Sequence, residues 1–266
     1  MTDQPLISCL CVSHHAAFLL ERSIACFCAQ TYPNKELLIV FRENNPGIKA
    51  AAGKNMHPGI KYIEVADEDC DTLGDLRNVS VQHAAGEYIC VWDDDDWYPD
   101  NRLSLQMRGI RESQKDACIL LHCIMYDMVG RQAYVSPLMP WEGSLMCRRA
   151  ILADKLRYAS MQRGEDTDLV AKLMWSNCIY PVILPVLYIY VYHGNNISGA
   201  SHFNMFFARG QKLSKQTSLV IYDILENKMS HEKATGLLFS PLVLDEINYF
   251  YSDLKKASLK LKENTL

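Results

Sequence analysis

Short apolar runs alternate with amphipathic segments through most of this chain. Apolar residues at every third or fourth position predict helices over residues 16–30 and 73–85. Apolar runs are typical of strands covered on both faces, and they occur within Leu6–Val12, Glu36–Phe41 and Glu87–Trp92; a further strand is predicted at Lys61–Val65. Strands joined by helices in this order form right-handed parallel crossovers. We therefore expect an α/β fold, Rossmann-like, with a mostly parallel central sheet flanked by helices.

The second half of the chain continues this rhythm and then changes. Pro99 is well placed as the first residue of a helix that reaches Ser113, and another helix ends at Trp175. Further strands are predicted at Cys118–Met125, Gln132–Val135, Ser144–Cys147, Ile179–Ile183 and Val186–Val191, and the last two should complete the same sheet. Residues 44–58 predict a loop with room for a helical turn, and after about Phe203 the pattern is helical, over 206–227 and 242–261. We expect a domain of residues 1–203 and a C-terminal helical extension of residues 204–266.

Composition and charge narrow the classes of function. With 266 residues, 49 % of them apolar, the chain can bury a large core. A net charge of −4 provides no basic surface for nucleic acid. No signal peptide is visible, and no apolar run is long enough to span a bilayer. We expect a soluble, cytoplasmic protein with reduced cysteines. The pairs Cys9-x-Cys11 and Cys26-x-Cys28 should lie in the core, because they fall in apolar segments and their spacing does not suit structural zinc.

Four consecutive aspartates, Asp93 to Asp96, follow the apolar strand that ends at Trp92; we call them the tetrad. Two unit charges about 6 Å apart repel by roughly 3 kcal/mol at an effective dielectric near 20. A divalent cation would collect this charge, because Mg²⁺ and Mn²⁺ prefer carboxylate oxygen. The alternative is a solvated turn between a strand and a helix. Ligands of open α/β sheets bind outside the carboxyl ends of the strands, so residues that follow Val12 and Phe41 should face the tetrad.

Several motifs occur in one order along the chain. They are Gln30-Thr31-Tyr32, Leu73-Gly74-x-x-Arg77-Asn78, Ala85-Gly86-Glu87-Tyr88, the tetrad followed by Pro99 and Arg102-Leu103, Gly143-Ser144 with Arg148-Arg149, Gly164-Glu165-Asp166-x-Asp168-Leu169, and Tyr192-His193-Gly194-Asn195. In this order they resemble family 2 glycosyltransferases of the GT-A fold, over about residues 5–203. The resemblance implies an inverting enzyme that moves a sugar from a nucleoside-diphosphate donor to a hydroxyl of a glycan or lipid-linked acceptor.

The resemblance also implies roles for individual residues. Asp95 would bind Mn²⁺ or Mg²⁺, with Asp96 and His193 as further ligands. Asp93 would lie near the ribose and Arg77 would reach the nucleotide, and further substrate contacts are expected from His14, Glu43, Asp94, Trp141 and Glu165. Asp166 would be the general base, taking the proton from the acceptor hydroxyl in a single displacement.

Structural roles remain open for several of these residues. Glu165 and Asp166 would also suit a helix N-terminus. His193 could instead be a hydrogen-bonded loop residue, and Arg77 could form an ion pair on a helix surface. The segment Phe41-Arg42-Glu43-Asn44-Asn45 departs from the family, in which two acidic residues follow the second strand, so the nucleotide base of the donor stays open.

Two other functions compete with transfer. One is a non-catalytic nucleotide-sugar or glycan-binding relative of the same fold. The other, a sugar-1-phosphate nucleotidyltransferase, is disfavoured because no Gly-rich phosphate loop occurs near the N-terminus. The C-terminal stretch combines Tyr249, Phe250 and Tyr251 with lysines at 255, 256, 260 and 262. It would pack on the core or on a second subunit as a homodimer, or make peripheral contact with an anionic membrane.

Overall fold

The computed structural model describes residues 4–14, 17–43, 45–54, 57–66 and 70–250. These residues form two compact units. The first unit takes its described residues from 4–123 and 138–189, and the second takes them from 124–137 and 190–250. The predicted domain boundary after residue 203 stays a prediction.

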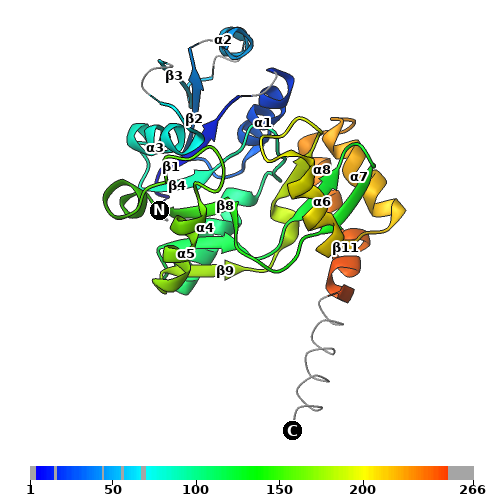
Figure 1. Cartoon of the computed structure of the whole chain (residues 1–266). Coiled ribbons are helices and arrows are strands. Elements are labelled where there is room, and N and C mark those ends of the chain that lie inside the picture. The colour runs from blue at the N-terminus through cyan, green and yellow to red at the C-terminus, as the bar shows by residue number, and fades with distance from the viewer. Residues whose placement is uncertain (1–3, 15–16, 44, 55–56, 67–69, 251–266) are drawn as a thin grey trace. The chain divides into compact units, whose positions relative to one another are not determined.

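A mostly parallel sheet forms the centre of the first unit (Figure 1). Among the described residues its strand order is β3-β2-β1-β4-β8-β5-β9, and β8 alone runs antiparallel to its neighbours. The strands are β1 (Ile7–Val12), β2 (Lys35–Arg42), β3 (Ile60–Val65), β4 (Tyr88–Val91), β5 (Ala117–Leu120), β8 (Trp141–Arg148) and β9 (Ile179–Val182). The expected α/β fold with a large, mostly parallel sheet is confirmed.

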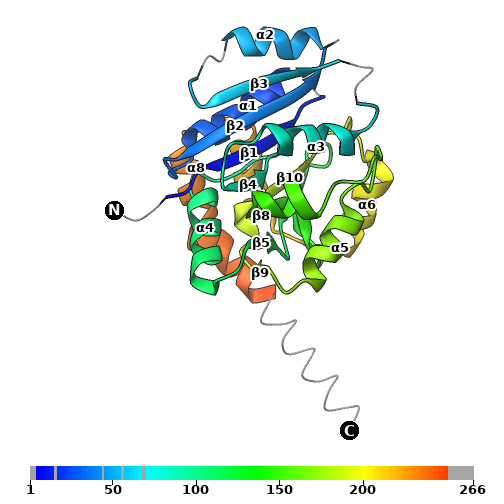
Figure 2. The same cartoon turned by 90° about the vertical axis from the view of Figure 1, so that its left-hand side faces the viewer.

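Helices cover both faces of this sheet. They are α1 (Ala17–Ala29), α2 (Pro46–Lys54), α3 (Leu73–His83), α4 (Arg102–Ser113) and α5 (Thr167–Trp175), with a π-helical turn η1 (Ile151–Lys155) and a 3₁₀ turn η2 (Pro185–Leu187). Figure 2 shows α3 lying along strands β1 and β2. On that face, Leu10 and Ile89 of the strands belong to one buried cluster with Val81 of α3, Leu152 of η1 and Leu169 of α5.

The alternate residues of the strands point to the opposite face, and many of them are cysteines. Cys9, Cys11 and Cys90 are fully buried. Of the ten cysteines, eight are buried and none forms a disulfide. The predicted core position is correct for Cys9, Cys11 and Cys26 and wrong for Cys28, which is exposed, and the reduced state stays a prediction.

The second unit combines a small sheet with helices. Its described strands are β6 (Ile124–Asp127), β7 (Gln132–Val135), β10 (Ile189–Tyr192) and β11 (Gln211–Lys212), in the order β10-β6-β7-β11. Its helices are α6 (Gly199–Arg209), α7 (Lys215–Leu225) and α8 (His231–Leu238), and residues 241–250 are helical as well. Among the residues described, we find no helix with the length and apolarity needed to cross a bilayer.

Two predicted strands were wrong because an apolar run does not reveal where a chain leaves its sheet. The run Cys118–Met125 is divided into β5 and β6, which belong to different sheets. The run Val186–Val191 begins in the turn η2, whose first residue is Pro185, and only then enters β10 of the small sheet. Periodicity cannot distinguish such breaks from a continuous buried strand.

Several helix boundaries also differ from the prediction. The loop predicted at 44–58 contains α2, and α4 begins at Arg102 rather than at Pro99. The stretch 206–227 is interrupted at Gly210 by β11, where a Cβ atom would lie 2.8 Å from Met125 Cε and 2.9 Å from the Val135 oxygen. Helix α8 was not predicted, and the predicted helix beyond residue 250, including Tyr251 and the lysines, lies outside the described residues.

Candidate active site

The tetrad lies at the carboxyl edge of β4 and is largely buried. Asp94, Asp95 and Asp96 are 3, 9 and 0 % exposed, and the side chain of Asp93 is 23 % exposed. A solvated turn, one of the two interpretations of the sequence, does not describe this environment. The four charges must therefore be stabilised by contacts inside the protein.

Neighbouring elements each contact a different member of the tetrad. Ser13, just after β1, donates to Asp94 Oδ2 at 2.5 Å, Tyr188, just after η2, donates to Asp96 Oδ2 at 2.6 Å, and Arg22 of α1 donates to the main-chain oxygen of Asp95. Hydrogen bonds donated to a carboxylate favour its charged form. The carboxylates of Asp94 and Asp96 therefore face different elements.

A buried arginine supports the strand that carries the tetrad. The Arg102 side chain is fully buried and donates through Nη2 to the oxygens of Val91, at 3.1 Å, and Gly143, at 3.0 Å. Its guanidinium lies 4.3 Å from the centre of the Tyr98 ring and 5.2 Å from that of Trp92. Arg102 thus fixes the end of β4 to β8 and places a positive charge near the tetrad.

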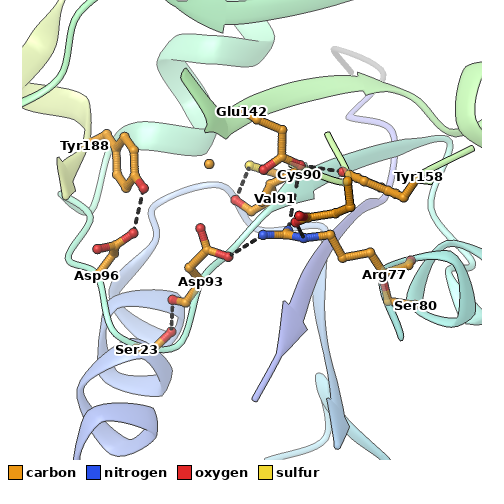
Figure 3. Close-up of polar contacts among 12 residues, drawn as sticks. Ser23, Arg77, Ser80, Cys90, Val91, Asp93, Asp96, Glu142, Tyr158 and Tyr188 are labelled. Carbon is orange, nitrogen blue, oxygen red and sulfur yellow. Dashed lines mark hydrogen bonds and ion pairs between the residues drawn. The ribbon is translucent and has the colours of Figure 1, made fainter. Parts of the chain in front are cut away.

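A second arginine, Arg77 of α3, lies among carboxylates that come from three parts of the chain (Figure 3). Its Nη2 is 3.2 Å from Asp93 Oδ1, its Nε is 3.1 Å from Glu165 Oε1, and its Nη1 is 3.7 Å from Glu142 Oε1. The side chain is only 12 % exposed. The ion pair expected on a helix surface is instead a buried cluster, and Asp75 forms a capping box with Thr72.

Tyr158 completes this cluster. Its hydroxyl donates to Glu142 Oε1 at 2.5 Å, and its ring centre lies 5.6 Å from the Arg77 guanidinium. Asn78, the neighbour of Arg77 on α3, binds the main chain of Tyr158 in both directions: Asn78 Nδ2 donates to the Tyr158 oxygen at 2.9 Å, and the Tyr158 N–H donates to Asn78 Oδ1 at 3.1 Å. The Arg-Asn motif therefore ties α3 to residues 156–165, which we call the base loop because the candidate base Asp166 follows it.

The cluster contains three carboxyl groups, those of Asp93, Glu142 and Glu165, around the single cation Arg77. Burial raises the pKa of Glu142 to about 8, and the negative charges of Asp166 and Asp93 act in the same direction, against the opposing effects of Arg77 and Tyr158. Burial also raises the pKa values of Asp93 and Glu165, while Arg77 opposes both shifts. Perturbed carboxyl groups gathered around one cation are typical of functional sites.

Gly74 sets the distance between α3 and the base loop. A Cβ at this position would lie 1.8 Å from the main-chain oxygen of Ala159 and 3.1 Å from Glu165 Cβ, so only glycine fits. The Gly74 N–H donates to the Met161 oxygen at 3.2 Å, and the Ala159 N–H donates to the Glu165 oxygen at 3.0 Å. These bonds close the base loop against the start of the helix.

Asp166 follows this loop as the N-cap residue of α5. Its side chain makes no capping hydrogen bond, and the residue is half-buried. Its negative charge acts on both Glu142 and Glu165, which places it beside the cluster. The helix-capping interpretation therefore lacks the expected bond, and the base assignment stays a prediction.

The other predicted substrate contacts are spread more widely. His14 lies half-buried just after β1, and Glu43 is exposed just after β2, where its N–H donates to the Val65 oxygen at 3.0 Å. Trp141 is the first residue of β8 and is 7 % exposed. His193 belongs to the second unit, where its N–H donates to Asn196 Oδ1 at 2.9 Å. Their proposed roles remain predictions.

The acidic residues supply the hard oxygen ligands that Mg²⁺ and Mn²⁺ require. Among the residues described, however, no group of three or more His, Cys, Asp or Glu side chains is arranged to hold a metal ion. A cation bound at Asp95 would thus depend on other oxygen atoms, such as those of a diphosphate and of water.

The sequence prediction missed Glu142, Tyr158, Ser13 and Tyr188. None of the four lies in a motif that we assigned to the site, and each reaches it only through the fold. The one available signal was for Glu142, an acidic residue directly before Gly143-Ser144 at the start of an apolar strand.

Comparisons with known proteins agree with this architecture. Residues 8–157 match glycosyl transferase family 2. The match ends before Asp166, so it includes the tetrad and Arg77 but not the candidate base. A curated relative, the Escherichia coli UDP-Glc:α-D-GlcNAc-diphosphoundecaprenol β-1,3-glucosyltransferase WfgD, is 27 % identical over 105 residues. This region is 40 % of the present chain and only 41 % of the relative.

Solved structures of low sequence identity share the fold. TarS from S. aureus, in complex with UDP-GlcNAc, gives a TM-score of 0.58 at 16 % identity, covering 92 % of this chain and 80 % of that one. The mannosyltransferase PcManGT from Pyrobaculum calidifontis, in complex with GDP-Man and Mn²⁺, gives 0.58 at 14 % identity, covering 99 % and 81 %. The fold is therefore GT-A, and with more than half of its length matched to the family, this chain belongs to glycosyl transferase family 2.

Proposed function

We propose that this protein transfers a sugar, with inversion, from a nucleoside-diphosphate donor to a hydroxyl group of an acceptor. The observation that carries the proposal is the junction at Arg77. There the acidic end of β4 and the base loop meet through one guanidinium, with Asp93 on one side and Glu165, the neighbour of Asp166, on the other. A site for the donor diphosphate and a carboxylate base are the two parts that a single displacement requires.

In this reaction Asp166 takes the proton from the acceptor hydroxyl while the hydroxyl oxygen attacks the anomeric carbon. The bond from that carbon to the diphosphate oxygen breaks, and the nucleoside diphosphate leaves with the electron pair. We assign the divalent cation to Asp95, with Asp93 on the ribose side. A bound Mn²⁺ or Mg²⁺ would neutralise charge on the leaving diphosphate. Asp96 and His193 remain predicted ligands, and Asp96 already accepts the Tyr188 hydroxyl.

The acceptor is proposed to be a glycan or a lipid-linked saccharide. Support comes from the curated relative, whose acceptor is a diphosphoundecaprenol-linked GlcNAc. A lipid-linked acceptor would bring a cytoplasmic enzyme to a membrane surface. The donor is proposed to be a nucleotide sugar because the solved neighbours were captured with UDP-GlcNAc and with GDP-Man.

The test is an assay of nucleoside-diphosphate release across a panel of UDP and GDP sugars, with and without Mn²⁺. We expect metal-dependent turnover of one donor, and we expect Asp166→Asn to bind that donor while losing turnover by at least about 10²-fold. Asp168→Asn is the matched control, because Asp168 lies two residues away, is exposed, and pairs with Lys172 at 2.5 Å. Equal loss in both variants would refute the base assignment, and donor binding without turnover would favour the non-catalytic relative.

A further inference from the structure

Arg77 pairs with three carboxylates within the protein. Each of its three nitrogen atoms faces a different carboxylate, at 3.1 Å for Glu165, 3.2 Å for Asp93 and 3.7 Å for Glu142. Arginine can donate only in the plane of its guanidinium, and one face of that plane is covered by the Tyr158 ring. Only 12 % of the side chain is exposed, so these ion pairs are largely shielded from solvent.

The partners of Arg77 belong to separate elements that must be aligned for transfer. Asp93 begins the tetrad after β4, Glu142 lies on β8, and Glu165 lies at the end of the base loop, directly before Asp166. Figure 3 shows Arg77 between Asp93 on one side and Glu142 with Tyr158 on the other. A shift of the guanidinium would therefore change the position of the tetrad, where the donor is proposed to bind, relative to Asp166.

Tyr158 connects this cluster to the main chain of the base loop. Its hydroxyl binds Glu142, its ring covers Arg77, and its main chain is held by Asn78. Consecutive residues of α3 thus hold the charged cluster and the main chain of the base loop. This is a more specific arrangement than an ion pair that only stabilises the helix.

From these contacts we propose that Arg77, Glu142 and Tyr158 form a positioning network for the base loop. The inference rests on the proposed transfer reaction. It gives Arg77 a role in addition to the one that the family resemblance implies, and it adds two residues that the motifs do not include. None of the three residues is itself the base or a reacting group.

The decisive variant is Tyr158→Phe, which removes one hydroxyl and does not touch Asp93 or the donor side. We expect kcat to fall about tenfold through misalignment of Asp166, while the Kd for the nucleoside diphosphate, measured by calorimetry, changes by less than about twofold. Arg77→Lys keeps the charge but loses the forked geometry, so its kcat should fall further. Tyr180→Phe is the matched control on the exposed strand β9 and should leave both quantities unchanged.

A second readout does not depend on turnover. Amide hydrogen exchange at residues 159–165 should accelerate in Tyr158→Phe and not in Tyr180→Phe, because the bond between Ala159 and Glu165 then loses its support. The inference is overturned if Arg77→Lys leaves kcat unchanged, or if exchange in the base loop does not change in Tyr158→Phe. A wild-type protein that turns over no donor would refute the proposed function, while the exchange experiment would still decide whether the network holds the loop.

Discussion

Substituting Gly74 by alanine tests whether the start of α3 sets the position of the base loop. The added Cβ would lie 1.8 Å from the Ala159 oxygen, and real Cβ atoms essentially never approach another heavy atom closer than 3.0 Å. The loop must therefore move away by at least the difference, 3.0 − 1.8 = 1.2 Å. The obstructing atom is main chain and cannot rotate aside, so the displacement is transmitted along the loop toward Glu165 and Asp166.

The substitution has opposing effects on stability. Alanine stabilises a helix interior relative to glycine by roughly 0.5–1 kcal/mol, whereas overpacking typically costs about 1–3 kcal/mol. Because the contact is with main chain, we expect the clash to dominate and the free energy of unfolding to fall by about 1–2 kcal/mol. A displacement near 1 Å at a reacting group can reduce turnover by about 10²-fold. Turnover should therefore fall much more than stability would explain.

The assay combines denaturant unfolding with turnover at saturating donor. Gly236→Ala is the matched control, because Gly236 lies within α8 and a Cβ there would have no heavy atom within 4 Å. It should raise the free energy of unfolding by up to about 1 kcal/mol and leave turnover unchanged. The reasoning is refuted if Gly74→Ala is as stable as Gly236→Ala and as active as the wild type.

Two further predictions concern charge. The pKa of Glu142, raised to about 8 by burial, lies above the value of about 4.3 expected in the unfolded chain. The folded protein therefore keeps this proton to a higher pH than the unfolded chain, so the free energy of unfolding should fall as pH rises from about 4 to 8. Glu142→Gln should reduce this fall, measured by denaturant unfolding at several pH values. An equally steep fall in the variant would contradict the prediction. Removing divalent ions with EDTA should leave the unfolding midpoint nearly unchanged, because protein groups already hold the tetrad. Mn²⁺ with a nucleoside diphosphate at about 100 Kd should stabilise the fold by about 2.7 kcal/mol, and unfolding in EDTA would refute this expectation.

The sequence predicted the parallel half of the fold well, for a physical reason. A strand buried on both faces must be largely apolar, and the runs that became β1, β2 and β4 have that pattern, whereas β3 carries the exposed residues Lys61 and Glu64. The apolar pattern did not locate the point at which the chain passes from one sheet to the other. Between β5 and β6 only His122 interrupts the apolar run, yet the chain leaves one sheet there and enters another.

The candidate site was predictable only where its residues are adjacent in sequence. The tetrad, the Arg-Asn motif and Glu165-Asp166 are recognisable because each lies in a short segment at the end of an element. Tyr158 and Glu142 are 16 residues apart and meet through a hydrogen bond that depends on the path of the base loop. The burial that raises the pKa of Glu142 likewise depends on the complete fold.

The structure changes what the tetrad implies about metal. From spacing alone, four adjacent carboxylates appear to require a cation to relieve their repulsion. In the folded protein, donors from separate elements already contact Asp93, Asp94 and Asp96, and Arg22 and Arg102 hold the main chain beside them. Because bonds donated to a carboxylate favour its charged form, the protein can assemble this acidic edge itself. In the proposed reaction the cation therefore serves the diphosphate of the donor, whose charge grows as the glycosidic bond breaks, and not the folding of the site.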